Sequence, residues 1–134
     1  TDGMDISLIR LNLRTKELQW AGANNPLYII KNDNLVEIKP DKQPIGYNYK
    51  MTDFTNHEVE TTEGDYIFIF TDGFADQFGG PKGKKYKYNT LKEKLLSVYT
   101  KPLHEQKQLF ANEFEQWKGN LQQVDDVCII GLRI

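Results

Sequence analysis

The stretch "DYIFIFTDGFADQFGG", from Asp65 to Gly80, changes character at its middle. Its first part, Tyr66 to Phe70, is a run of large apolar and aromatic residues that predicts a buried strand. Its second part begins with Asp72 and Gly73 and continues with small and acidic residues. Gly73 allows backbone or a ligand to come close to this point. Asp72 is therefore expected at the end of a rigid element, where preorganised catalytic or metal-binding groups belong.

Short strands are predicted on the N-terminal side of this stretch. Apolar residues from Ile6 to Leu13 alternate on two faces, which favours a strand covered on both sides. Turn sequences rich in Gly, Asn, Asp and Pro then separate a series of short strands. We expect these strands at Glu17 to Ala21, Leu27 to Lys31, Leu35 to Lys39 and Phe54 to Val59. Together they predict an antiparallel meander.

Helical patterns begin only near Thr90. The segment "TLKEKLLSVYT" is one candidate, and a clearer helix follows, with Pro102 in its first turn and Gly119 as its stop. The chain closes with a predicted buried strand, Val127 to Ile134. Strands first, helices next and a final strand that rejoins the sheet predict an α+β fold, an antiparallel β-sandwich with helices packed on one side.

Length and composition limit the function classes. A chain of 134 residues with 39% hydrophobic residues is the size of a single domain with one core. A net charge of -2 implies no basic surface for nucleic acid. No stretch reaches the roughly 20 apolar residues of a membrane span. Cys128, inside the apolar run "VCIIGL", is expected to be a buried thiol, and a cytoplasmic protein is predicted.

A second acidic site, Asp125 and Asp126, comes directly before the closing strand. If both acidic sites face one point, they form a cluster of hard oxygen ligands, which selects magnesium or manganese over zinc. Such ions activate water and shield phosphate charge, so phosphoester hydrolysis is the natural chemistry. The alternative is structural, since Asp-Gly after a strand is most often a turn and Asp near a strand start commonly caps one.

Two other kinds of phosphatase are excluded by single residues. Haloacid-dehalogenase-type enzymes need a second Asp two residues after the first, and position 74 is Phe74. Cysteine-dependent phosphatases need a thiolate in a phosphate-binding loop, whereas Cys128 lies within a predicted strand.

Four motifs in order resemble one family. The stretches "WAGANNPLYII", "QPIG", "DYIFIFTDGFADQFGG" and "QVDDVCIIGLRI" look like those of the SpoIIE/RsbU-type serine phosphatases, bacterial relatives of the type 2C, metal-dependent protein phosphatases. The resemblance covers essentially the whole chain. It implies an αββα sandwich with a two-metal centre of manganese or magnesium, where a bridging water attacks a phosphoserine or phosphothreonine.

The resemblance also implies roles for particular residues. Asp72 and Asp125 bind the same metal in the family pattern, and Asp126 is a candidate for support beside them. The implied partners are a phosphoprotein substrate, for instance a phosphorylated anti-anti-sigma-type regulator, and an N-terminal sensor or signalling domain. No nucleic-acid or membrane partner is implied for this segment.

One family motif has no counterpart here. The family's "GD.SGHG"-like segment, whose Asp bridges both metals, is absent, and the sequence begins at Thr1 just before a predicted strand. Residues 1–134 are therefore expected to be one domain, the C-terminal portion of a SpoIIE-type phosphatase domain that lacks the N-terminal metal-binding segment. On its own it is expected to be inactive. The rival hypothesis is a degenerate phosphatase-like domain that acts as a protein-binding or regulatory module.

Two further features receive structural interpretations, and a third allows two. Asp2 and Asp5, in "TDGMD", are assigned no catalytic role, and Asn24 and Asn25 are expected to fix turn geometry. The basic stretch "GGPKGKKYKY" is consistent either with steering of an acidic phosphoprotein or with a flexible solvated loop.

Overall fold

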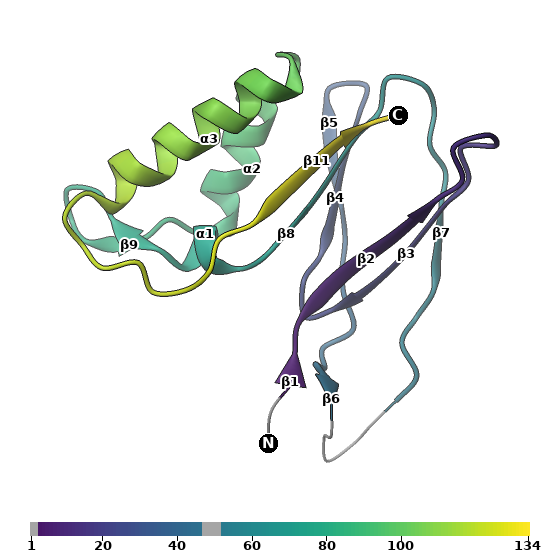
Figure 1. Ribbon diagram of the computed structural model, residues 1–134, viewed down its shortest axis with the longest axis horizontal. Helices are drawn as coiled ribbons and strands as arrows, with labels where there is room; N and C mark the ends of the chain where they lie inside the picture. The colour runs from purple at the N-terminus through teal and green to yellow at the C-terminus, as the bar shows by residue number, and fades with distance from the viewer. Residues whose placement is uncertain (1–2, 47–51) are drawn as a thin grey trace. The chain divides into compact units, whose positions relative to one another are not determined.

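The computed structural model describes residues 3–46 and 52–134, which form two compact units (Figure 1). The first unit comprises the chain up to Phe70 together with the C-terminal segment Ile129–Ile134, and the second comprises Thr71–Cys128. The first unit contains the larger sheets, and the second contains the helices and a two-stranded sheet. The α+β class and the antiparallel sheets predicted from the sequence are thereby confirmed.

Two larger antiparallel sheets and a two-stranded pair make up the described part of the first unit. The strand order is β11-β8-β4-β5 in one sheet and β2-β3-β7 in the other, and β1 pairs with β6. Their bounds are β1 Gly3–Met4, β2 Ile6–Leu11, β3 Leu18–Ala23, β4 Leu27–Lys31, β5 Asn34–Ile38, β6 Ile45–Gly46, β7 His57–Val59, β8 Tyr66–Phe70 and β11 Ile129–Arg133.

The core of the first unit lies between these two sheets. Leu18, Trp20 and Val59 come from one sheet and pack in one cluster with Leu27 and other residues of the second sheet. Alternate residues of each strand therefore point into a shared apolar layer, as in a β-sandwich. The predicted sandwich is confirmed.

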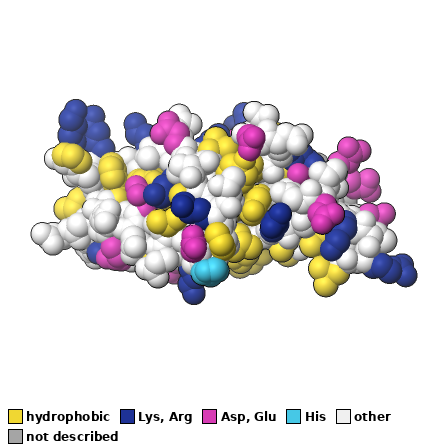
Figure 2. Space-filling view, turned by 90° about the horizontal axis from the view of Figure 1, so that it is seen from above, with side chains coloured by type: hydrophobic (Ala, Val, Ile, Leu, Met, Phe, Trp, Pro, Cys, Tyr) yellow, Lys and Arg dark blue, Asp and Glu magenta, His cyan; other side chains and the backbone are white. Residues whose placement is uncertain are grey.

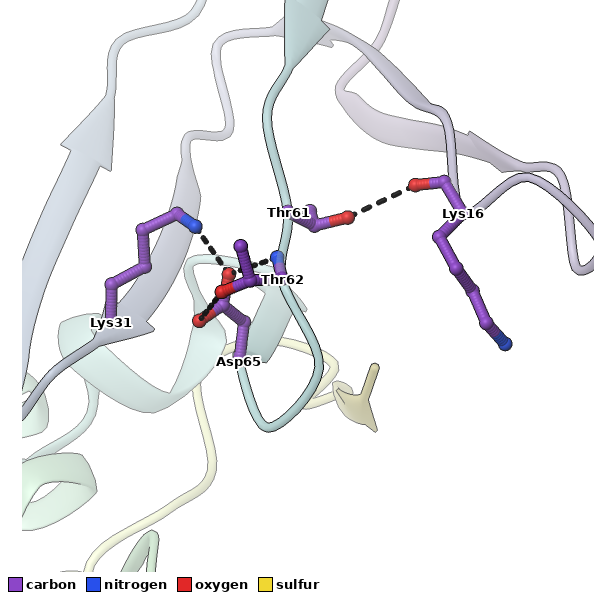
Figure 3. A network of polar contacts seen from close by, with 5 residues as sticks. All are labelled: Lys16, Lys31, Thr61, Thr62 and Asp65. Atoms are coloured by element: carbon purple, nitrogen blue, oxygen red, sulfur yellow. Dashed lines mark hydrogen bonds and ion pairs between the residues drawn. The ribbon is translucent and has the colours of Figure 1, made fainter.

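One polar network closes an end of the first unit (Figure 3). Lys31 of β4 forms an ion pair with Asp65, which is buried, and the backbone N–H of Thr62 donates to the same carboxylate at 2.8 Å. Thr61 Oγ1 donates to the carbonyl of Lys16 at 3.0 Å. These contacts fix the turn that enters β8, the strand that ends before Asp72.

An aromatic cluster organises the second unit. Its elements are α1 Gly73–Asp76, β9 Phe78–Gly79, β10 Lys84–Lys85, α2 Tyr88–Val98 and α3 Leu103–Lys118. The ring of Phe74 from α1 contacts Tyr86 at 4.9 Å and, on α3, Phe114 at 5.1 Å and Phe110 at 6.0 Å between centroids. Burial of these rings explains why a helix as short as α1 forms at all.

Several local predictions need correction. The helical part of the chain begins at Gly73 and not near Thr90, because the apolar anchor Phe74 stabilises one helical turn. The closing strand begins at Ile129 and is only partly buried, and Cys128 before it is exposed, so the predicted buried thiol is wrong. The first strand is not covered on both faces, since Leu8 is 59% exposed. Ile9 and Leu11 of the same strand pack against the core.

The helices are short and amphipathic. In residues 3–46 and 52–134, none is long and apolar enough to span a membrane.

Candidate functional site

Asp72 lies at the N-terminus of α1, two residues after β8 ends. Its backbone carbonyl accepts the N–H of Asp76 at 2.9 Å, the first hydrogen bond of the helical turn. The Asp72 side chain makes no capping hydrogen bond to α1. Helix capping, the usual structural reason for Asp at this position, therefore does not account for this carboxylate.

The segment with Asp72 lies directly against the segment with Asp125 and Asp126. Thr71, which precedes Asp72, makes three hydrogen bonds to the segment with Asp125 and Asp126, each at 3.0 Å. The Thr71 N–H donates to the carbonyl of Cys128, and the Thr71 hydroxyl donates to the carbonyl of Asp126. The N–H of Cys128 donates to the same hydroxyl. A Cβ added to Gly73 would stand 2.2 Å from the Asp126 carbonyl oxygen. Only glycine therefore fits at position 73 without a shift, because the Asp126 backbone occupies the space that a Cβ would fill.

The strands that lead to the two segments are antiparallel neighbours. Ile129 of β11 pairs with Phe70 of β8, and the register continues to Arg133 and Tyr66. The final strand thus rejoins the sheet, as the sequence predicts. That Asp72 and Asp125 bind one ion stays a prediction.

Gln77 fixes the loop that carries Asp125, and nothing in the sequence marked it. It follows α1 and is fully buried. Its Nε2 donates to the Gln122 carbonyl at 2.9 Å, and its Oε1 accepts the N–H of Val124 at 3.3 Å. Its own carbonyl accepts from Trp117 Nε1 at 2.9 Å. A single buried residue thus connects α1, α3 and the acidic loop through its side-chain amide and its backbone carbonyl.

The two aspartates of the loop are exposed to solvent. Asp125 Oδ1 accepts the backbone N–H of Asp126 at 2.7 Å, and its carbonyl accepts from Gln123 Nε2 at 2.9 Å. The first contact orients the Asp125 carboxylate by holding one of its oxygens.

The donor chemistry suits a hard cation, although the ligand set is small. Asp72 and Asp125 supply carboxylate oxygens, the ligands that Mg²⁺ and Mn²⁺ prefer. Among the described residues, no group of three or more His, Cys, Asp and Glu side chains is placed to hold a metal ion. The described residues therefore show no complete metal centre, and binding of one ion by Asp72 and Asp125 remains a prediction.

The acidic residues near the N-terminus have structural surroundings. Asp5 Oδ1 accepts from Asn24 Nδ2 at 2.8 Å, and Asn24 has a φ of 61°, a left-handed conformation that Asn tolerates in turns. The turn role predicted for Asn24 is confirmed, and Asp5 supports that turn. Asp2 lies outside the described residues.

A family model supplies the decisive comparison. Residues 2–134 match the model described as Stage II sporulation protein E (SpoIIE). The chain belongs to the SpoIIE family. No curated protein matches the sequence.

Solved phosphatase domains share the fold of this SpoIIE-family chain. It is similar to the SiaA-PP2C domain of Pseudomonas aeruginosa, with 30% identity and a TM-score of 0.89 over 97% of this chain and 51% of that one. It is also similar to the phosphatase domain of the cell fate determinant SpoIIE from Bacillus subtilis, with 19% identity and a TM-score of 0.71 over 97% of this chain and 58% of that one. The chain thus spans little more than half of these domains.

Proposed function

We propose that this chain is the C-terminal portion of a metal-dependent protein serine/threonine phosphatase domain. The observation that carries the proposal is the backbone contact between the Asp72 and Asp125 segments, made by Thr71 and Gly73. This contact brings two carboxylate-bearing segments together in a chain that belongs to the SpoIIE family.

In this proposal each residue of the site has a defined task. Asp72 and Asp125 bind one Mn²⁺ or Mg²⁺ ion, and Asp126 supports them through its backbone. Gln77 and Thr71 hold the two segments in register. The bound metal would supply an activated water and shield the phosphate charge. The remaining ligands, including a carboxylate that bridges two ions, would come from an N-terminal portion of a longer parent chain.

The proposed substrate is a phosphoserine or phosphothreonine protein of a signalling pathway, such as a phosphorylated anti-anti-sigma-type regulator. An N-terminal sensor or signalling domain in a cytoplasmic bacterial parent protein would control the reaction. These assignments are supported by the family and not by a contact in this chain.

One observation favours a second candidate function. Among the described residues, no third His, Cys, Asp or Glu side chain joins two others to form a metal site. An incomplete site of this kind fits a degenerate domain that binds a phosphoprotein without hydrolysing it. Such a module would keep the fold and the partner surface while losing turnover.

Hydrolysis of p-nitrophenyl phosphate with Mn²⁺ separates these possibilities. We expect the 134-residue chain to be inactive or nearly so, because a two-metal mechanism needs ions about 3.5–4 Å apart that share a bridging ligand. The longer parent chain should be active, and its activity should disappear with EDTA and return with Mn²⁺. An inactive parent with intact fold would favour the binding module, and robust turnover by the 134-residue chain would show that its own ligand set is complete.

A further inference from the structure

A hairpin beside the candidate site carries the densest positive charge of the chain. We name residues 78–87 the lysine hairpin; it contains β9, β10 and the turn between them. Four of the 17 Lys and Arg residues lie in it, and no Asp or Glu does. They are Lys82, Lys84, Lys85 and Lys87.

Most of this charge is available to a partner. All four lysines are exposed. Lys85 pairs with Asp76 at 3.5 Å and lies over the exposed Phe78 ring at 5.8 Å. The other three make no ion pair within residues 3–46 and 52–134. Figure 2 shows dark blue Lys and Arg side chains projecting at the left end, the side on which Figure 1 draws β9.

The lysine hairpin is fixed in place. Gly80 donates its N–H to the Trp117 carbonyl at 2.9 Å, and a Cβ on Gly79 would stand 1.8 Å from that oxygen. Tyr86, between the last two lysines, is buried against Phe74 and Trp117. The lysines are thus presented on an anchored element, which lowers the entropic cost of binding a partner.

The hairpin is anchored on the element that carries Asp72. The Tyr86 N–H donates to the Gln77 carbonyl at 2.9 Å, and the Lys87 N–H donates to the Ala75 carbonyl at 2.8 Å. Ala75 is within one helical turn of Asp72, at about 1.5 Å of rise per residue. The end of the hairpin and the candidate site therefore share one short helix.

Lys87 has a backbone conformation that favours glycine. Its φ of 76° and ψ of 154° lie in a region that L-residues rarely adopt. Its side chain is exposed and buries nothing that would offset this strain. A lysine therefore occupies a position where glycine would relieve the backbone strain.

We propose that the lysine hairpin binds an acidic segment of the phosphoprotein substrate and guides its phosphorylated residue to the Asp72 site, an inference that rests on the proposed phosphatase function. Positive charge beside the site complements acidic residues around a phosphoserine and increases the rate of encounter. A nucleic acid is a poorer fit, because the chain as a whole has a net charge of -2. Exposed Phe78 adds an apolar contact suited to a peptide.

Fluorescence anisotropy with labelled peptides tests this without catalysis. The 134-residue chain is titrated, in EDTA, into a phosphoserine peptide with Glu flanks and into one with Ser and Gly flanks. We expect tighter binding of the acidic peptide, and we expect Lys82→Glu/Lys84→Glu to weaken it about tenfold, with a smaller effect at high salt. The matched control Lys101→Glu/Lys107→Glu makes the same charge change on exposed lysines outside the hairpin and should change the affinity less than threefold.

Other results would overturn the proposal. Equal affinity for the two peptides, or equal effects of the two double variants on affinity, would show that the hairpin lysines bind no better than other surface lysines. Tighter binding of an oligouridylate of the same charge than of the acidic peptide would make the hairpin a polyanion site. Turnover of p-nitrophenyl phosphate by the longer parent chain reports on the phosphatase proposal separately, so failure of one proposal is not mistaken for failure of the other.

Lys87→Gly adds a readout that a structural role alone would not give. Glycine relieves the positive φ, so the melting temperature should rise, while affinity for the acidic peptide should fall severalfold. A stabilised variant with unchanged affinity would contradict a binding role for Lys87.

Discussion

Replacing Gly73 by alanine tests whether the two acidic segments are held together as the structure describes. The new Cβ would stand 2.2 Å from the Asp126 carbonyl oxygen and 2.9 Å from its carbon. Because Cβ contacts closer than 3.0 Å essentially never occur, the Asp126 backbone must move by about 1 Å. That carbonyl is also the acceptor of the Thr71 hydroxyl, so the movement strains this hydrogen bond as well.

Two opposing energies decide the stability of Gly73→Ala. Alanine favours a helix over glycine by up to about 1 kcal/mol, whereas overpacking costs about 1–3 kcal/mol. We expect the clash to dominate, with a net loss of roughly 1 kcal/mol in the free energy of unfolding of the 134-residue chain. In the longer parent chain, displacement of the Asp125 loop by about 1 Å should reduce phosphatase activity about 100-fold.

Urea unfolding, amide NMR spectra and hydrolysis of p-nitrophenyl phosphate measure these effects. Gly64→Ala is the control, because Gly64 has a φ of 93° and no atom near its Cβ position, so it loses stability by backbone strain alone. Amide shifts should concentrate in residues 124–128 for Gly73→Ala and spare them for Gly64→Ala. A Gly73→Ala protein that is more stable than wild type, with unshifted loop resonances, would refute the contact.

Three further outcomes are expected. Asp72→Asn and Asp125→Asn should each remove most Mn²⁺-dependent activity of the longer parent chain, since each variant loses a charged metal ligand. The circular dichroism spectrum should stay unchanged. A variant with wild-type activity would exclude the substituted residue from metal binding. Gln77→Leu should lower the free energy of unfolding by about 1–3 kcal/mol, because it leaves hydrogen-bonding groups of the loop without partners; an unchanged urea midpoint would contradict this. Burial acts to raise the pKa of Asp65, but hydrogen bonds from Lys31 and Thr62 outweigh it and hold that pKa below its ordinary value. The stabilisation by ionised Asp65 is therefore complete above about pH 4 and lost as pH falls through the lowered pKa. Asp65→Asn should be less stable than wild type at pH 7, and this difference in the free energy of unfolding should shrink in acid. A constant difference from pH 7 to pH 2 would argue against this role of Asp65.

The elements that sequence predicts well are those with long, regular apolar patterns. The strand Leu27–Lys31 and the helix Leu103–Lys118 with Gly119 after it have the predicted bounds within one residue. In both, the period of the apolar residues and the flanking turn signals agree. Local pattern and tertiary burial therefore lead to the same result in these segments.

The features that sequence reasoning missed depend on tertiary contacts. Four residues of α1 are too few to show a helical period, and its Gly and Asp disfavour helix, so only burial of Phe74 reveals it. Apolar neighbours suggested a buried Cys128, yet the residue leaves its side chain in solvent while its backbone pairs with Thr71. Gln77 has no sequence signal, because a buried glutamine is defined only by the groups around it.

The acidic loop is positioned by polar contacts and not by apolar burial. Every residue from Leu121 to Asp126 is exposed, so this segment gains little from the hydrophobic effect. Its place depends on the Gln77 amide, the Thr71 hydroxyl and the space beside Gly73. Such a loop responds more to the loss of one hydrogen bond than to changes in the aromatic cluster. A cation shared by Asp72 and Asp125 would add a fourth contact, so metal binding should order the loop, and ordering of the loop should in turn raise metal affinity.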